Sequence, residues 1–167
     1  LLFDCGDGVS AGLGQKGRKV RTIALSHVDR DHSSGLLNFL QLNGRGQLPV
    51  IYYPADCGSV PALAEFSRRF DPQQEGKPQW IPVREGDQVP VGKGRFLDVL
   101  PNEHIEAAPG LCKSVSYRLV EKRRHLLDEV TQEPRVIGAR AGHGRTLAVG
   151  DLPEEPLCDV RKGFIDV

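Results

Sequence analysis

The sequence predicts a single layered α/β domain with mixed sheets, spanning residues 1–167. Apolar segments of strand length alternate with helical segments up to about residue 72, whereas strand-like segments separated by Gly and Pro turns follow one another beyond it. The 167 residues, of which 39% are hydrophobic, are enough for one domain with its own core. Residues 121–144 are charged and weakly patterned, and we expect them to form a surface excursion, either a loop or a short helix.

Seven segments are expected to form strands, because they are short, largely apolar and bounded by turn residues. In chain order these are residues 1–5, 20–26, 49–53, 79–83, 95–100, 114–120 and 145–149. The chain contains no methionine, and its first three residues already have the character of the middle of a strand. We therefore expect a fragment whose fold is incomplete at both ends.

Two helices are expected in the first half. Ser33 or Ser34 can cap the first, which Asn43-Gly44 ends, and Ser59 can cap the second, with Pro61 in its first turn. The apolar residues expected to face the core are Leu36, Leu37, Leu40 and Leu42 in the first helix and Val60, Leu63, Ala64 and Phe70 in the second.

The composition limits the classes of partner. The 22 basic and 22 acidic residues cancel, so no global field attracts nucleic acid or an anionic membrane, and a polyanionic substrate would have to be held locally. No apolar run approaches the ~18 residues of a membrane span, and no secretory signal is evident. The four cysteines, Cys5, Cys57, Cys112 and Cys158, are far apart and form no CxxC pair. That pattern fits reduced thiols in a cytoplasmic protein, with one distant disulfide as the alternative.

The strongest functional signal lies directly after the strand at 20–26. Four potential metal ligands, His27, Asp29, Asp31 and His32, fall within six positions. Imidazole and carboxylate are good ligands for zinc, manganese or iron, and a pair of divalent cations would compensate the clustered charge. If the chain stays extended, residues 27, 29 and 31 project to one side, and His32 turns in from the start of the next helix. The alternative interpretation is a solvated, charged loop.

Two later residues are candidate ligands for the same ions. His104 follows the strand at 95–100 and would supply a third protein ligand from elsewhere in the fold; the alternative is an ordinary surface histidine. Asp151 follows Gly150 at the end of the strand at 145–149, where a carboxylate is well placed to bridge two cations. The alternative for Asp151 is a turn or a helix cap before Pro153.

Two other motifs in the first twenty residues are weaker. Residues 8–12 match Gly-x-Ser-x-Gly, but the nucleophile elbow of serine hydrolases needs a strand running directly into it and a helix directly after it. Glycines 12, 14 and 17 match a dinucleotide fingerprint, but a strand follows them instead of a helix. We expect neither a serine nucleophile nor a dinucleotide site.

Together these segments resemble the metallo-β-lactamase superfamily, and most closely its ribonuclease Z branch. Ser26-His-Val-Asp-Arg-Asp-His32 stands where the family has His-x-His-x-Asp-His. The other resembling segments follow in the family's order: the opening strand and turn at 2–8, the next strand at 49–54, His104 with residues 114–119, and the strand at 147–151. The resemblance implies an αββα sandwich with mixed sheets and two bound divalent metal ions.

The resemblance also implies a division of the ligands. His27, Asp29 and His104 would hold the first metal, Asp31 and His32 would hold the second, and Asp151 would bridge them. Asp31 would also be the catalytic residue that positions the attacking water and takes its proton. The family resemblance makes a homodimer a further expectation.

Three features depart from the family pattern. Asp29 replaces the usual second histidine; a similar His-x-Asp-x-Asp-His pattern occurs in a related domain of bacterial DNA-uptake channel proteins. No histidine follows Asp151, so the last metal-binding histidine is missing, and the general acid cannot be assigned. In many members of the ribonuclease Z branch, a long arm that grips transfer RNA is inserted between the third ligand and the bridging aspartate. Here His104 and Asp151 are only 47 residues apart, which leaves little room for such an arm. Because Asp29 makes the site less positive by one charge, we expect manganese or iron to be favoured relative to zinc.

The expected function is that of a metal-dependent hydrolase, a phosphodiesterase or endoribonuclease that acts on RNA or another phosphodiester. One alternative is a metallohydrolase of small molecules such as lactones, thioesters or cyclic nucleotides. The other is a degenerate, non-catalytic scaffold of the same fold. With one metal ligand missing, we expect weak or no turnover from these 167 residues alone.

Overall fold

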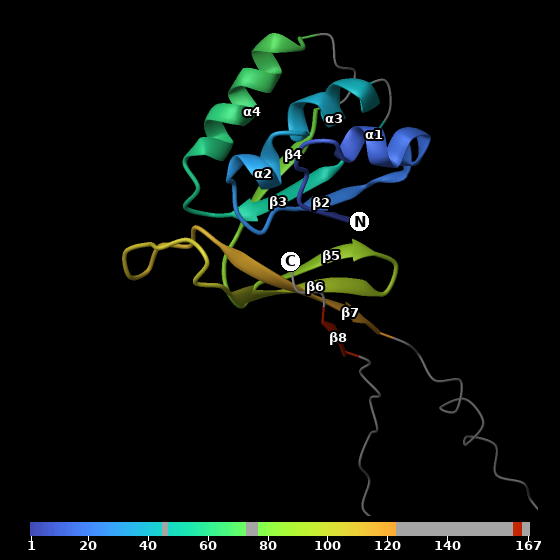
Figure 1. The fold of residues 1–167 in the computed structure, drawn as a ribbon. Helices are drawn as coiled ribbons and strands as arrows, with labels where there is room; N and C mark the ends of the chain where they lie inside the picture. Colours follow the sequence, from blue (N-terminus) through green and yellow to red (C-terminus); the bar gives the residue numbers. More distant parts are fainter. Residues whose placement is uncertain (45–46, 73–76, 123–161, 165–167) are drawn as a thin grey trace, which may run out of the picture.

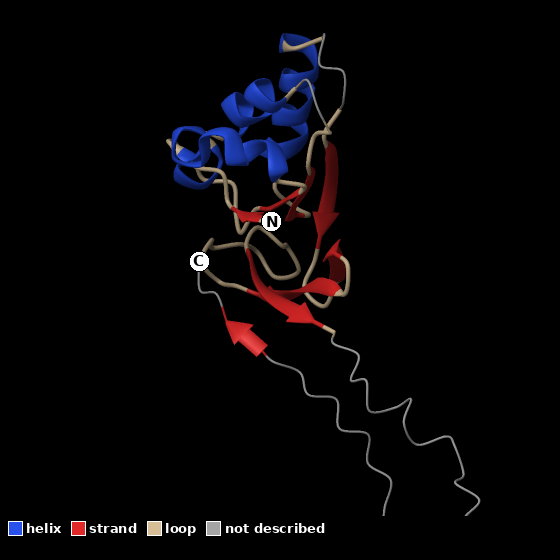
Figure 2. Ribbon diagram, turned by 90° about the vertical axis from the view of Figure 1, so that its right-hand side faces the viewer, coloured by secondary structure: helices blue, strands red, loops and turns tan. Residues whose placement is uncertain are grey.

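A computed structural model describes residues 1–44, 47–72, 77–122 and 162–164 of the chain (Figure 1). It contains two four-stranded sheets, with the helices packed on one side of the first sheet and the second sheet on the other (Figures 1 and 2). The predicted layered α/β architecture is confirmed, with both parallel and antiparallel pairing. No described helix follows the second sheet, so the described residues do not form the second helical layer of an αββα sandwich. The predicted strand at 145–149 and nearly all of the predicted excursion at 121–144 lie outside the described residues.

The first sheet is parallel. Its strands, in their spatial order, are β1 (Leu2–Phe3), β2 (Thr22–Ala24), β3 (Val50–Pro54) and β4 (Gln79–Val83). Ile23 of β2 pairs with Leu2 on one side and with Ile51 on the other. All three residues of β2 are buried, as expected for a central strand covered on both faces. The four strands lie within or within one residue of the segments predicted from the sequence.

Five helical segments connect these strands and cover one face of the sheet (Figure 1). They are α1 (Val9–Leu13), the 3₁₀ segment η1 (Gly14–Lys19), α2 (Arg30–Ser33), α3 (Leu36–Asn43) and α4 (Ser59–Phe70).

The helix predicted between Ser33 or Ser34 and Asn43 corresponds to α3, and a separate short helix, α2, precedes it within the metal-ligand motif. The backbone N–H of Gly35 donates to the carbonyl of Cys5 at 2.9 Å. Neither Ser33 nor Ser34 caps α3, whose N-cap is Gly35. The Ser33 hydroxyl instead donates to the carbonyl of Asp29 at 3.0 Å.

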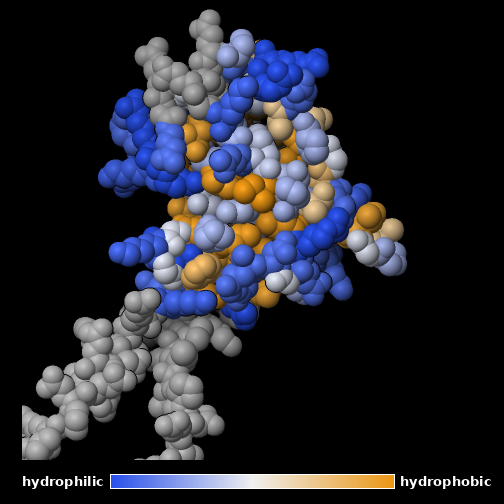
Figure 3. Space-filling model, turned by 180° about the vertical axis from the view of Figure 1, so that it is seen from behind, coloured by the Kyte–Doolittle hydropathy of each residue, from blue (hydrophilic) through white to orange (hydrophobic). Residues whose placement is uncertain are grey.

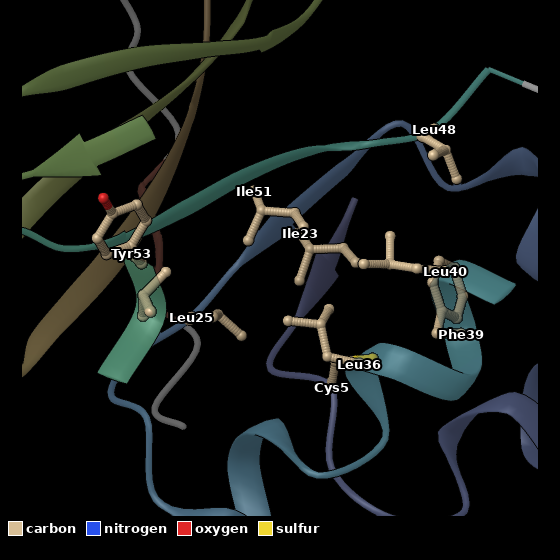
Figure 4. Close-up of a cluster of buried hydrophobic side chains, with 10 residues drawn as sticks. Cys5, Ile23, Leu25, Leu36, Phe39, Leu40, Leu48, Ile51 and Tyr53 are labelled. Carbon is tan, nitrogen blue, oxygen red and sulfur yellow. The ribbon is translucent and has the colours of Figure 1, made fainter. Parts of the chain in front are cut away.

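A hydrophobic core lies between the first sheet and its helices (Figure 4). Ile23 and Ile51 face Leu36 and Leu40 of α3, and all four side chains are fully buried. Burying each such side chain stabilises the fold by about 1.5–3 kcal/mol. Burial also raises the pKa of the Cys5 thiol to about 12, so this cysteine stays protonated and unreactive.

Two residues that we expected in this core lie outside it. Leu42 is 61% exposed, because it lies about 200° around the helix from the buried Leu40, and Phe39 takes the inward position that the sequence analysis did not assign. Phe70, in the last turn of α4, is 67% exposed and stacks on Phe66 with ring centroids 5.3 Å apart. The other predicted inner residues are buried or half-buried.

The second sheet is antiparallel, with its strands in chain order. They are β5 (Gln88–Gly92), β6 (Arg95–Pro101), β7 (Val115–Glu121) and β8 (Lys162–Phe164). The sequence predicted β6 and β7 to within one residue but not β5, which contains Pro90 and, among the described strands, pairs with β6 alone. Proline has no backbone N–H, and it is tolerated on an edge strand because no strand on the open side needs a hydrogen bond from it.

A second hydrophobic core lies between the two sheets. Leu97 and Val99 of β6 and Val115 and Tyr117 of β7 pack against Ala24 and the strands beside it. Seen from behind, hydrophobic residues form a band across the middle of the molecule, between hydrophilic residues above and below (Figure 3). Within the described ranges, no helix combines the length and the apolar character needed to cross a membrane.

Candidate metal centre

The predicted ligands follow the end of β2, where the chain changes from extended to helical. Leu25 still donates its N–H to Tyr52 of the neighbouring strand at 2.9 Å, and Ser26 and His27 are buried. Asp29 is the N-cap residue of α2, so the extended stretch ends there. The expectation that residues 27, 29 and 31 alternate along one extended chain is therefore wrong: Asp31 and His32 both project from α2.

Despite this difference, three of the predicted ligands form a compact group. His27, Asp31 and His32 each offer one ligand atom, and these atoms lie within 4.8 Å of one another. The Nε2 atom of His32 is 3.4 Å from a carboxylate oxygen of Asp31, and the imidazole centroids of His27 and His32 are 3.9 Å apart. Imidazole nitrogens and a carboxylate together form a donor set that first-row divalent ions bind.

The other predicted ligands border this group or lie outside the described residues. A carboxylate oxygen of Asp29 is 3.9 Å from Nε2 of His27, and the Asp29 side chain is 63% exposed. The His104 ring meets the His27 ring edge-on, with centroids 4.8 Å apart. Asp151 lies outside the described residues. His27 is thus the residue around which all the described candidates gather.

A buried carboxylate, Asp4, supports the two central histidines, and the sequence analysis missed it. One Asp4 oxygen accepts the backbone N–H of Ser26 at 2.7 Å, and the other lies 2.9 Å from the Ser26 hydroxyl and 2.8 Å from Nδ1 of His32. Asp4 adopts a left-handed backbone conformation, with φ of 53°, which Asp tolerates better than most residues. This conformation at the end of β1 lets the carboxylate face the next strand.

These hydrogen bonds fix the tautomer of both imidazoles. The Ser26 hydroxyl has one hydrogen, which it donates to Asp4, so its oxygen accepts the N–H from Nδ1 of His27 at 3.0 Å. His32 likewise donates from Nδ1 to Asp4. In the neutral form of each ring, the lone pair then lies on Nε2, the nitrogen next to the carboxylates of Asp29 and Asp31.

The electrostatic surroundings of His27 also favour the neutral ring that a metal ion needs. Burial lowers the pKa of His27, and the neighbouring His32 lowers it further, against an opposing effect of Asp29. A neutral imidazole keeps the free lone pair that a cation binds, so this histidine is prepared to act as a ligand at neutral pH.

His104 lies on the loop between β6 and β7 of the second sheet, and two hydrogen bonds hold that sheet beside the metal-ligand motif. The Tyr117 hydroxyl donates to the carbonyl of Leu25 at 3.0 Å, and the Val115 N–H donates to the carbonyl of Ser26 at 2.8 Å. Burial strongly raises the pKa of Tyr117, so the phenol stays a hydrogen-bond donor. β7 is therefore tied to the residues that immediately precede His27.

The loop that carries His104 is ordered by its own polar side chains. The carbonyl oxygen of the Asn102 side chain accepts the His104 N–H at 2.6 Å. The Ser114 hydroxyl donates to the backbone carbonyl of Asn102 at 2.7 Å, and the Asn102 amide donates to Ser116 at 3.0 Å. The start of β7 thereby sets the position of His104.

Two glycines allow the first turn of the chain to lie directly on α2. The Cys5 N–H donates to the carbonyl of His32 at 2.7 Å. A Cβ atom at Gly6 would overlap with the carbonyl oxygen of Asp31, and one at Gly35 would overlap with the carbonyl oxygen of Gly6. Glycine at both positions is therefore needed to hold Asp31 and His32 against Asp4.

The two weaker motifs acquire no site among the described residues. Ser10 lies within α1, and its hydroxyl makes no hydrogen bond to any described residue, so none of these residues is placed to act on it as a base. Glycines 12, 14 and 17 lie in or beside α1 and η1, and β2 follows them.

Comparisons with known proteins give similarity only at the level of solved structures. No protein-family model matches the chain, and no curated protein matches it significantly. The metallo-β-lactamase fold protein YhfI from Bacillus subtilis is 17% identical, with a TM-score of 0.48 over 70% of this chain and 44% of its own. BJP-1, a subclass B3 metallo-β-lactamase of Bradyrhizobium japonicum, is 17% identical, with a TM-score of 0.46 over 73% and 47%.

Human tRNase Z, short form, is 19% identical, with a TM-score of 0.43 over 71% of this chain and 53% of its own. The chain thus spans about half of the length of these three proteins.

Proposed function

We propose that this chain carries the metal site of a binuclear metal-dependent hydrolase of the metallo-β-lactamase type, acting on phosphodiesters and resembling ribonuclease Z. The observation that carries the proposal is the group formed by His27, Asp31 and His32, in which Nδ1 of each imidazole contacts a supporting side chain and Nε2 is left for a metal ion. Asp4 contacts the His32 ring directly and the His27 ring through the Ser26 hydroxyl. The order of the motifs along the chain supports the same family.

In this proposal His27, Asp29 and His104 hold the first ion, and Asp31 and His32 hold the second. The ring contact between His27 and His104 and the short distance between His32 and Asp31 support this division. Asp151 is proposed as the bridging ligand from its sequence position alone. With Asp29 in place of a histidine, the site is proposed to accept manganese or iron as well as zinc.

The chain's own groups have distinct roles in the proposed reaction. Divalent ions, when bound, supply Lewis acidity toward water and toward the oxygens of the phosphodiester. Asp4 and Ser26 hold the two imidazoles in place, which preserves the geometry of the site through a catalytic cycle. Asp31, whose side chain is 77% exposed, orients the attacking water and accepts its proton.

The first test is elemental analysis of the protein purified without chelators. We expect about two metal ions per chain in the wild type, a loss in His27→Ala and Asp31→Ala, and no loss in His125→Ala, a control that removes a histidine of the charged segment. Wild-type protein that binds no metal, even after reconstitution, would refute the hydrolase proposal and favour a non-catalytic scaffold.

A substrate panel then separates the two enzyme hypotheses. RNA, bis-p-nitrophenyl phosphate and a lactone are offered to the metal-loaded protein. Cleavage of the two phosphodiesters that is lost in Asp31→Ala supports the proposal. Turnover of the lactone alone would refute the phosphodiesterase assignment in favour of a small-molecule hydrolase. The neutral net charge of the chain is the observation that favours this second candidate.

A further inference from the structure

The neutral chain has an uneven distribution of charge near its start. Residues 8–28 contain Lys16, Arg18, Lys19 and Arg21 and no carboxylate. We call these four residues the basic cluster. All four side chains are exposed, and no described carboxylate forms an ion pair with any of them. Other exposed arginines of this protein, such as Arg68 and Arg84, are neutralised by Glu65 and Asp56.

The basic cluster lies on a rigid part of the fold. Three of its members belong to η1, which packs on α3 through Gly17, and a Cβ at Gly17 would be only 3.3 Å from the ring of Phe39. The Val20 N–H donates to the Gly17 carbonyl at 3.0 Å, so the turn between η1 and β2 is closed. The backbone positions of these residues are therefore set before any ligand binds, which reduces the entropy cost of binding.

A surface cavity of about 590 Å³ opens beside this cluster. Arg18 and Arg21 line it together with three other polar residues, Gln41, Asn43 and Gln47. Nη1 of Arg21 donates to the carbonyls of Arg18 at 2.8 Å and Gln47 at 3.5 Å, which holds the guanidinium at the cavity wall.

No described residue accepts a hydrogen bond from the Nε or Nη2 atoms of Arg21, so these donors are available to a ligand. A planar guanidinium with free donors is well suited to phosphate oxygens.

We infer that the basic cluster is a second binding site, which holds the phosphate backbone of a single-stranded nucleic acid away from the metal centre. This inference rests on the proposed phosphodiesterase function and specifies its substrate as a polynucleotide. Arg21 precedes β2 and His27 follows it, so the Cα atoms of these two residues are at most about 20 Å apart, the length of an extended chain of six residues. An oligonucleotide longer than several nucleotides spans that distance, whereas a dinucleotide does not.

The test compares two triple variants that remove the same charge. Lys16→Gln/Arg18→Gln/Lys19→Gln removes most of the basic cluster and leaves Arg21, whose side chain bonds to the backbone. Lys77→Gln/Lys93→Gln/Arg95→Gln removes three exposed cations elsewhere. Affinity for fluorescent single-stranded RNA and DNA of about 20 nucleotides is measured by anisotropy over a range of salt concentrations, and the strand is checked to be intact afterwards.

If all three cations contact phosphates, we expect the cluster variant to bind the 20-mer about 100-fold more weakly than the wild type at 0.1 M salt. The slope of log affinity against log salt concentration should become shallower by about 2. The control variant should match the wild type, and both should bind a dinucleotide as the wild type does. Equal weakening in the two variants, or no binding by the wild type, would overturn the inference. If the cluster variant loses binding to phosphatidylserine vesicles but binds nucleic acid as the wild type does, the inference is overturned in favour of a membrane-binding surface.

Hydrolysis of bis-p-nitrophenyl phosphate by the same proteins separates this inference from the proposed function. The substrate is too small to reach the basic cluster, so we expect all three proteins to hydrolyse it equally. Equal hydrolysis without cluster-dependent binding leaves the hydrolase proposal standing and overturns the second site. Cluster-dependent binding in a protein that neither holds metal nor hydrolyses the ester supports the second site and refutes the hydrolase. The Lys16→Gln/Lys19→Gln double variant, with its smaller charge change, provides the same comparison if the triple variant folds poorly.

Discussion

Replacing Gly6 by alanine tests how the first turn of the chain controls the metal centre. The added methyl group would overlap with the Asp31 carbonyl oxygen and lie 3.1 Å from its carbon. Because both partners are backbone, no side-chain rotation relieves the clash, and α2 or the turn must move. Gly6 itself does not have a positive φ, so alanine causes no backbone strain there and the effect comes from this contact alone.

The size of the effect follows from two costs. Forcing an extra methyl group into a closely packed contact costs about 1–3 kcal/mol, which corresponds to a fall in Tm of about 2–12 °C for a chain of this size. Movement of α2 also separates His32 from Asp4, and the loss of such a supporting hydrogen bond weakens metal binding by about 10–100-fold. Both changes should therefore appear in one variant.

Thermal unfolding and a metal titration measure these two effects, and Gly12→Ala is the matched control. Gly12 lies in α1 with no atom within 4 Å of an added Cβ, so alanine there should leave metal affinity unchanged and stabilise the helix by about 0.5–1 kcal/mol. If Gly6→Ala melts at the wild-type temperature and binds metal with wild-type affinity, the close contact between the first turn and α2 does not position the ligands.

Three further predictions concern the polar contacts. Asp4→Asn keeps the shape of the carboxylate but removes its charge, and we expect metal affinity to fall about 10–100-fold in the same titration. Tyr117→Phe leaves a buried carbonyl without its 3.0 Å donor, and we expect a loss of about 1–3 kcal/mol in urea unfolding. Hydrogen bonds from Arg84 lower the pKa of Asp56 below its ordinary 3.8, so the stability difference between the wild type and Asp56→Asn should be full above pH 3.8 and disappear as the pH falls through the lowered pKa. A difference that persists unchanged at lower pH would contradict that last assignment.

The sequence predicted the parts of the site that local pattern determines. The position of β2 and the ligand-rich segment after it follow from an apolar run that ends in a polar cluster. The sequence did not predict that α2 begins at Arg30, because the cap at Asp29 makes no side-chain bond and only the contact of Gly6 and Gly35 fixes the break before α3. Whether Asp31 projects from a strand or a helix therefore depended on tertiary packing.

Asp4 shows a different limit of sequence reasoning. Its role depends on the parallel pairing of β1 with β2, which places residues 4 and 26 side by side although 22 positions separate them. The available signal was an aspartate that follows a short apolar strand and precedes a Cys-Gly-Asp-Gly turn. That signal identifies a turn, and only the left-handed conformation of Asp4 reveals that the carboxylate points inward.

The proposed centre draws its ligands from both sheets, so metal binding and the packing of the sheets should be coupled. His27 follows β2 of the first sheet, whereas His104 follows β6 of the second, and Tyr117 and Val115 join the sheets beside them. A metal ion present at 100 times its Kd stabilises the bound fold by about 2.7 kcal/mol, which is comparable with the hydrogen bond of Tyr117. An ion held by both histidines would therefore contribute as much to the contact between the sheets as that hydrogen bond does.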